Sequence, residues 1–185
     1  MVYELMTEGG IPVDLDELKG FLRVSHTHDD LRIQHFYKSA FAFCEKYTGL
    51  SFREQDYRLH MSGAEAALGA YLAKNPFKSV VSVQAVLNNQ AVTLTSEQYH
   101  LSVSNASALF FISDSDVIAQ CDAGHNKVQF EFKVDYGHVP DGVHLAAKMI
   151  TAFYYENRGD TAAVNNSQVP PEALKILDQY RVLFL

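Results

Sequence analysis

Residues 140–160, PDGVHLAAKMITAFYYENRGD, form the longest apolar helical pattern in the chain. Pro140 suits the first turn of a helix, because its missing N–H has no intrahelical partner there in any case. Gly159 suits the left-handed position that ends a helix. A helix that is apolar over much of its surface packs against more than one neighbour, so we expect the rest of the fold to pack on this segment. Its two mostly apolar rows are Leu145, Met149, Ala152, Phe153 and Glu156, and then Ala146, Ile150 and Tyr154.

Helical patterns also occupy the N-terminal part of the chain. Asp14 and Glu17 have the spacing of a capping box, which predicts the start of a short helix. Thr27 is a favourable N-cap for a longer helix over residues 28–48, and Gly49 suits its end. The side chains expected to be buried are Leu15, Leu18, Phe21 and Leu22 in the first helix, and Leu31, Ile33, Phe36, Tyr37, Ala40, Cys44 and Tyr47 in the second.

The middle of the chain changes to an alternating pattern that is typical of half-buried strands. It is clearest over residues 127–136, where apolar and polar side chains alternate without a break. Asn88-Asn89 predicts a tight hairpin turn. Residues 63–75 are compatible with a short helix or a loop. Further strands are expected around residues 57–61, 80–87, 91–94, 99–103 and 108–112.

These patterns together predict an α+β fold. A polar loop is expected over residues 161–168, followed by a last helix that starts at Pro170-Pro171. The helices at the two ends of the sequence must cover each other's apolar faces. We therefore expect one domain over residues 1–185, with a helical core interrupted by a β-rich insertion. The core is predicted over residues 13–50 and 140–182, and the insertion over residues 55–136.

Composition describes an ordinary globular chain. A length of 185 residues favours one domain, and the net charge of −7 does not support a broad basic face that grips DNA. No apolar run approaches the roughly 20 residues that cross a bilayer, and the acidic N-terminus is unlike a signal peptide. Cys44, expected in a helix, and Cys121, expected in a loop, are too few for a disulfide framework. We expect a soluble protein made in the cytoplasm.

One group of potential metal ligands is close together in the sequence: His26, His28, Asp29 and Asp30. Ligands on a helix usually stand four residues apart, as in H-E-x-x-H, whereas these lie side by side. They are better explained as residues that cap a helix and complement its dipole. A metal-dependent hydrolase built on this group is kept as an alternative.

Other catalytic patterns are missing from the sequence. It has no glycine-rich phosphate loop and no G-x-S-x-G nucleophile elbow. Cys44 lies on the inner face of its predicted helix, as a buried structural thiol would. Glu156 and Arg158 fit an ordinary helix C-terminus. We therefore predict no catalytic residue, no metal site and no cofactor.

The C-terminal part of the chain has more apolar and aromatic side chains than one core of this size needs. They are either buried or part of a subunit interface, where Tyr, Phe and Arg are enriched. The candidate interface residues are Tyr154, Tyr155, Arg158, Tyr180, Arg181, Val182, Leu183, Phe184 and Leu185.

Eight short motifs follow one another along the chain: PVDLDELKGFLRV (12–24), DDL (29–31), EKYTG (45–49), NPFKSVVSV (75–83), VDYG (134–137), VP (139–140), AFYYENR (152–158) and VPPEALKILDQYR (169–181). In this order and at these spacings, the chain resembles the head–tail connector (adaptor) proteins of long-tailed bacteriophages and prophages, which are also described as DNA-packaging proteins. Each motif is weak alone, but the ordered set is specific and covers nearly the whole chain.

The resemblance implies a structural, non-enzymatic protein of the virion neck, made in the bacterial cytoplasm. Such proteins form a homo-oligomeric ring, about twelvefold in the particle, below the portal protein. The ring extends the DNA channel and carries the next neck or tail-completion protein, and DNA passes without specific binding. No membrane is involved. Residues 180–185 would dock on the portal, although the chain stops soon after its last helix. Residues 61–75 are longer than in the family and have no role that the resemblance assigns.

A third possibility is a binding module whose β-rich insertion captures a peptide or host factor at a sheet edge. It predicts a stable monomer. The connector predicts self-association without substrate turnover, and the hydrolase predicts stoichiometric metal binding.

Overall fold

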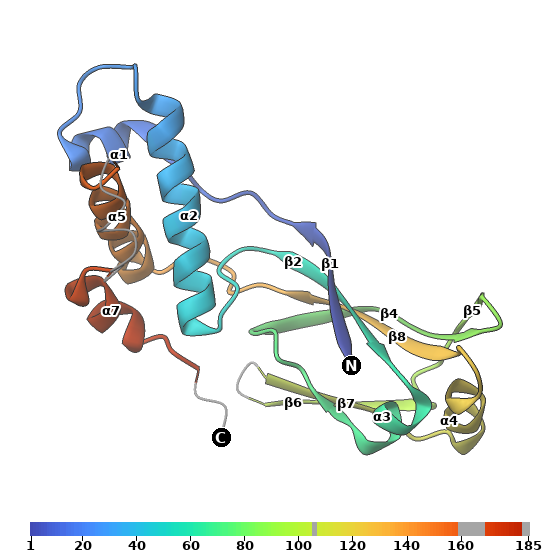
Figure 1. Cartoon of the computed structure of the whole chain (residues 1–185). Coiled ribbons are helices and arrows are strands. Elements are labelled where there is room, and N and C mark those ends of the chain that lie inside the picture. Colours follow the sequence, from blue (N-terminus) through green and yellow to red (C-terminus); the bar gives the residue numbers. More distant parts are fainter. Residues whose placement is uncertain (105–106, 159–168, 183–185) are drawn as a thin grey trace. The chain divides into compact units, whose positions relative to one another are not determined.

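The structure, a computed structural model, describes residues 1–104, 107–158 and 169–182. It has the α+β fold that the sequence predicts, and the chain divides into two compact units. Met1–Gly9 and Ser51–Gly137 form a β unit, and Gly10–Leu50 with His138–Leu185 form a helical unit (Figure 1). The chain therefore passes from one unit to the other three times.

The helical unit brings both ends of the sequence together. Its described helices are α1 (Leu15–Leu22), α2 (Asp30–Thr48), α5 (Asp141–Glu156) and α7 (Pro171–Asp178). α5 contacts the other three helices, so this segment packs against more than one neighbour, as predicted. The buried side chains of this core are Leu18, Ile33, Tyr37, Ala40, Phe41, Cys44, Val143, Ala146, Ala147, Ile150, Ala173 and Leu177.

The buried faces differ from the predicted ones at several positions. Of the two rows predicted for α5, the one with Ala146 and Ile150 is buried, whereas Leu145 in the other row is 43% exposed. Phe21 and Leu31, both predicted to be buried, are 43% and 74% exposed. α1 is short, and Leu18 is its one fully buried side chain. Leu31 lies in the first turn of α2, off the row that faces α5. The helical unit therefore has large apolar side chains on its surface, which the sequence predictions had placed in the core.

The helix starts agree with the sequence in part. Asp14 caps α1 as predicted, since its Oδ1 accepts a hydrogen bond from the Glu17 N–H at 3.0 Å. Thr27 does not cap α2, because it closes the turn before the helix: its carbonyl accepts from the Asp30 N–H at 3.3 Å. Pro140 occupies the N-cap position of α5 rather than its first turn. Gly159 and the predicted loop over residues 161–168 lie outside the described residues.

The β unit consists of two antiparallel sheets, with strand orders β1-β2-β8-β4-β5 and β3-β7-β6. β8 (Lys127–Val134) lies at the centre of the larger sheet, and its side chains alternate between buried and half-buried, as predicted. The other strands are β1 (Val2–Glu8), β2 (Gln55–Met61), β3 (Ala70–Tyr71), β4 (Phe77–Leu87), β5 (Gln90–Thr93), β6 (Tyr99–Ser104) and β7 (Ser107–Ile112).

Aromatic rings join the two sheets. Phe110 of β7 stacks on Phe130 of β8 with ring centroids 4.3 Å apart, and both side chains are fully buried. Two short helices, α3 (Gly63–Leu68) and α4 (Ser115–Asp122), pack against each other at one end of this unit (Figure 1). The β unit therefore has a core of its own.

Several elements of the β unit differ from the predictions. β1 is formed by residues for which the sequence predicts nothing. Cys121, expected in a loop, lies instead in the eight-residue helix α4. It is on the buried face of this helix and is 1% exposed. Residues 63–75, for which the sequence was compatible with either a short helix or a loop, contain α3 and β3. The turn at Asn88-Asn89 is confirmed, because both residues have positive φ, 51° and 66°.

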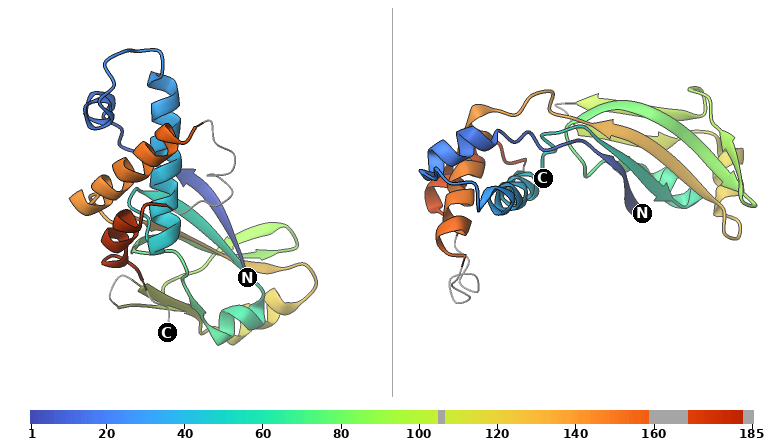
Figure 2. Two further views of the ribbon diagram at one scale, coloured as in Figure 1. Left: turned by 60° about the vertical axis from the view of Figure 1, so that its left-hand side comes forward. Right: turned by 90° about the horizontal axis from the view of Figure 1, so that it is seen from above.

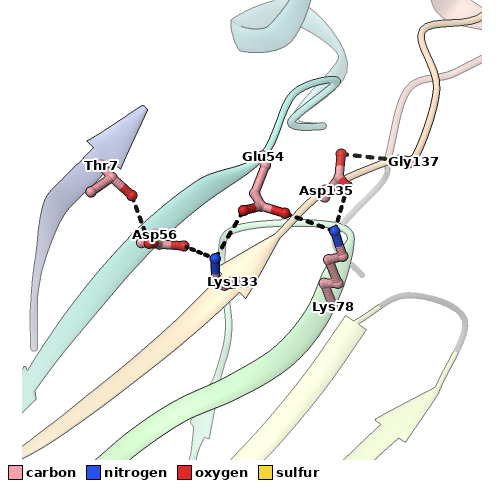
Figure 3. Close-up of polar contacts among 7 residues, drawn as sticks. All are labelled: Thr7, Glu54, Asp56, Lys78, Lys133, Asp135 and Gly137. Atoms are coloured by element: carbon pink, nitrogen blue, oxygen red, sulfur yellow. Dashed lines mark hydrogen bonds and ion pairs between the residues drawn. The ribbon is translucent and has the colours of Figure 1, made fainter. Parts of the chain in front are cut away.

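A network of charges holds together the ends of the β unit from which the chain leaves (Figure 3). The Glu54 carboxylate accepts from the ammonium groups of Lys133 and Lys78, each at 2.8 Å. These hydrogen bonds, with that from Lys133 the larger, lower the pKa of Glu54 to about 2. Lys78 continues the network to Asp135, at 2.9 Å. Nearby, Thr7 donates to Asp56 at 2.6 Å, so segments preceding or following all three passages are tied to one another.

Two glycines test the packing of these units by opposite effects. A Cβ added at Gly63 would lie 2.2 Å from the carbonyl oxygen of Ile118 in α4. We expect Gly63→Ala to lower the free energy of unfolding by about 1–3 kcal/mol, because the backbone must shift. A Cβ at Gly20 meets no atom within 4 Å. Gly20→Ala should therefore raise the free energy of unfolding by about 0.5–1 kcal/mol, because alanine favours the helix more than glycine does. Urea unfolding followed by circular dichroism measures both, and effects of the same sign would contradict this packing.

Candidate interaction surfaces

The potential metal ligands His26, His28, Asp29 and Asp30, kept as an alternative, do not form a metal site in the described part of the chain. The rings of His26 and His28 lie 5.9 Å apart between centroids. Asp30 instead forms an ion pair with Lys19 at 2.8 Å, and Asp29 is held by a cation and a hydroxyl, as described next. In the part of the chain that the structure describes, no group of three or more His, Cys, Asp or Glu side chains is arranged to hold a metal ion. The two carboxylates have structural partners in place of a metal.

Asp29 links two of the predicted interface residues to α2. The Tyr155 hydroxyl donates to Asp29 Oδ2 at 2.8 Å, and Arg32 donates to Asp29 Oδ1 at 3.1 Å. Arg158 lies over the Tyr155 ring, 4.4 Å from its centroid, and donates to the Tyr155 carbonyl at 2.7 Å. The hydrogen bond from Tyr155 lowers the pKa of Asp29, and Arg32 and Arg158 lower it further. The same bond raises the pKa of Tyr155.

An open groove lies beside this cluster, between the start of α2 and Arg158, the second residue after α5. It encloses about 510 Å³ and is lined by Leu31, Arg32, His35, Phe36 and Arg158. Of these five, sequence analysis selects only Arg158 as an interface residue. Leu31 and Phe36 were assigned to the core, but they lie off the buried row of Ile33, Tyr37, Ala40 and Cys44. The spacing of that row is the signal that separates the groove residues from the core.

Tyr154, another candidate interface residue, packs beside the groove. Its ring is half-buried and lies 6.3 Å from Phe36 between centroids. Burial raises the pKa of its hydroxyl. Tyr154 therefore packs behind Phe36, which lines the groove. In the same segment, residues 152–158, Tyr155 and Arg158 form the polar contacts with Asp29 and with each other.

The C-terminal candidates are partly engaged within the helical unit. Arg181 lies over the Tyr47 ring, 5.5 Å from its centroid, and Tyr47 in turn donates to Asp178 at 2.7 Å. The Val182 N–H donates to the Thr48 carbonyl at 2.9 Å. Tyr180 packs on α5, since its hydroxyl would meet a Cβ at Gly142 at 2.8 Å. Leu183, Phe184 and Leu185 lie outside the described residues, and the interface role of the segment stays a prediction.

The described helices were also compared with what a bilayer requires. None of them is both long enough and apolar enough to cross one.

Comparison with known proteins identifies the family. The sequence model of the head completion proteins matches residues 13–183. The chain belongs to the head completion protein family. This membership confirms the predicted relation to phage head–tail connectors, and with it a structural role at the junction of head and tail. No curated protein matches the chain.

Solved structures of similar fold come from gene transfer agent (GTA) particles, two of them from the neck. A chain in the neck of an empty GTA particle, computed with C6 symmetry, has a TM-score of 0.74 and 16% identity, with 100% of this chain and 97% of that chain covered. A chain of the native GTA virion has a TM-score of 0.72, 16% identity and the same coverage. A chain in the native neck, computed with C12 symmetry, has a TM-score of 0.63 and 18% identity, with 97% of each chain covered. These relatives share the whole fold, including the β unit.

The pairing of Tyr155 with Asp29 can be tested by titration. Tyr155→Phe removes the donor, so the pKa of Asp29 should rise toward its ordinary value of 3.8. Because the native pKa is lowered, the carboxylate stabilises the fold at neutral pH, and this contribution is lost as pH falls through the native pKa. The pH dependence of the Asp29 carboxyl carbon shift in NMR measures the change. Tyr154→Phe, which removes the neighbouring hydroxyl, serves as the control, and an equal effect of both variants would contradict the assignment.

Proposed function

We propose that this chain is the subunit of a neck ring that joins head to tail and extends the DNA channel. The observation that carries the proposal is the match of the head completion family over residues 13–183, together with the likeness of a neck chain over the full length. The role is structural, and we expect no substrate turnover. The mature subunit would be found in the neck of the particle.

A ring requires two different patches on each subunit, which meet when the rotation closes. Relatives of this fold occur in necks computed with C6 and C12 symmetry, which supports a ring of about twelve copies here. Tyr155 and Arg158 are candidates for one patch, because they lie at the edge of an open groove. Tyr180, Arg181 and the apolar residues 182–185 are candidates for a second contact, either with a neighbouring subunit or with the portal protein. The opposite side of the ring would carry the next neck or tail-completion protein.

The charges of the chain suit a channel that DNA passes without being held. Each phosphate that a protein neutralises adds salt-dependent affinity, and the net charge of −7 disfavours such contacts. Three of the basic side chains on the outer face of the larger sheet are already paired. Arg58 donates to Glu131 at 2.7 Å, and Lys78 and Lys133 both bind Glu54. This face therefore offers few unpaired cations to a phosphate backbone.

The self-association that the ring requires can be measured by light scattering across a concentration series. We expect a mass that rises toward about a dozen subunits at high concentration, with loss of assembly when the apolar segment is disabled. The sharper variant combines Val182→Ser, Leu183→Ser, Phe184→Ser and Leu185→Ser. It keeps the backbone N–H that bonds to Thr48 and removes only the apolar side chains.

Deletion of residues 182–185 is the companion variant. Assembly that persists in both would contradict a role of this segment in subunit contact and leave docking on the portal as its function. Co-purification with the portal protein of the same particle then tests the neck role directly. A subunit that neither self-associates nor binds that portal would contradict the proposed function.

A further inference from the structure

One face of α1 is exposed and contacts the rest of the helical unit through the ion pair of Glu17 with Lys148. Asp16 and Glu17 lie one helical turn before Gly20 and Phe21, so the four residues share this face. Phe21 is 43% exposed, although an aromatic ring of this size gains most from burial. Glu17 is paired with Lys148, and Asp16 is fully at the surface. The face is therefore an exposed aromatic ring beside acidic groups.

The groove beside α2 has the opposite character. Leu31 and Phe36 give it apolar walls, and Leu31 is 74% exposed. Arg32 and Arg158 add two positive charges, of which Asp29 cancels one. The Arg32 side chain is 55% exposed and keeps donors directed to solvent. The groove suits an apolar ring that is accompanied by a carboxylate.

These two surfaces lie on different sides of the helical unit. In the left view of Figure 2, α1 and the C-terminal end of α5 are on opposite sides of α2. The ion pair between Lys19 and Asp30 holds α1 on its side, and the bond between Tyr155 and Asp29 holds the end of α5 on the other. Phe21 is not among the residues that line the groove of its own copy.

We propose that the exposed face of α1, with Phe21 and Asp16, docks into the groove of a second copy of this chain, lined by Leu31, Phe36, Arg32 and Arg158. This inference rests on the proposed ring and names the surfaces that form it. The two surfaces differ, so the contact is heterologous and each copy offers one of each kind. Such contacts propagate from copy to copy and close into a ring when the rotation permits. The match of an acidic surface with a basic one fixes which side meets which.

Cross-linking between single cysteines tests this pairing. Gly20→Cys places a thiol beside Phe21, where a Cβ meets no atom within 4 Å, and Leu31→Cys places one at the exposed wall of the groove. The native cysteines, Cys44 and Cys121, are 0% and 1% exposed, and burial raises the pKa of both thiols, that of Cys44 to about 12. They therefore do not compete for a short thiol-specific cross-linker under mild conditions.

The expected products are specific to a heterologous contact. A mixture of the two single-cysteine variants should give a covalent heterodimer and stop there. The variant that carries both cysteines should give a ladder of multimers. Lys46→Cys is the control partner for Gly20→Cys. Lys46 is exposed on α2, the helix that carries Leu31, but lies about 22 Å from Leu31 along the helix axis. Phe21→Ala should reduce the heterodimer yield about tenfold, the effect of losing one central aromatic contact.

Light scattering on the same samples separates this inference from the proposed function. Equal cross-linking to Lys46→Cys, or no cross-linking to Leu31→Cys, would overturn the pairing at any observed mass. A ring-sized mass without the cross-link would leave the neck role intact and place the subunit contact elsewhere. A selective heterodimer that Phe21→Ala weakens supports the pairing.

Discussion

The packing of α2 against α5 is the constraint on which the rest of the structure depends. The two helices come from opposite ends of the sequence, and each is stable only when its buried row is covered by the other. Small side chains, Ala40 on α2 and Ala146 and Ala147 on α5, let the two backbones approach closely. Most of the β unit, residues Ser51–Gly137, therefore lies between them in the sequence. The Glu54 network ties together, within the β unit, the segments next to the chain passages.

The candidate surfaces follow from the same packing. Once the row with Ala146 and Ile150 is buried, the end of α5 brings Tyr155 and Arg158 to the start of α2. Asp29 fixes the two helices to each other there, and the groove forms where Leu31 extends beyond the core. The residues with the strongest resemblance to metal ligands thus serve to join helices. We propose that this surface recognises another protein.

The sequence predicted what depends on periodicity. The alternation of β8 and the apolar rows of α5 are long enough for their faces to be counted, and both units follow from them. α4 was missed because Val117 and Ile118 are its only large apolar residues, whereas α1 and α7, of the same length, have three or more. β1 was missed because an exposed edge strand needs no alternation. The bond between Tyr155 and Asp29 spans 126 residues, and nothing local in the sequence marks it. Leu31 and Phe36 were assigned to the core because side-chain type alone does not distinguish a buried face from a docking surface.

The number of copies in each particle tests the central claim most directly. Quantitative mass spectrometry of purified particles, with the portal protein and the major head protein as internal references, measures it. A neck ring of this fold predicts about twelve copies, equal to the portal and far fewer than the head protein. A count in the hundreds would indicate a shell or tail-tube protein, and a protein that is absent from finished particles would contradict a structural role in the neck.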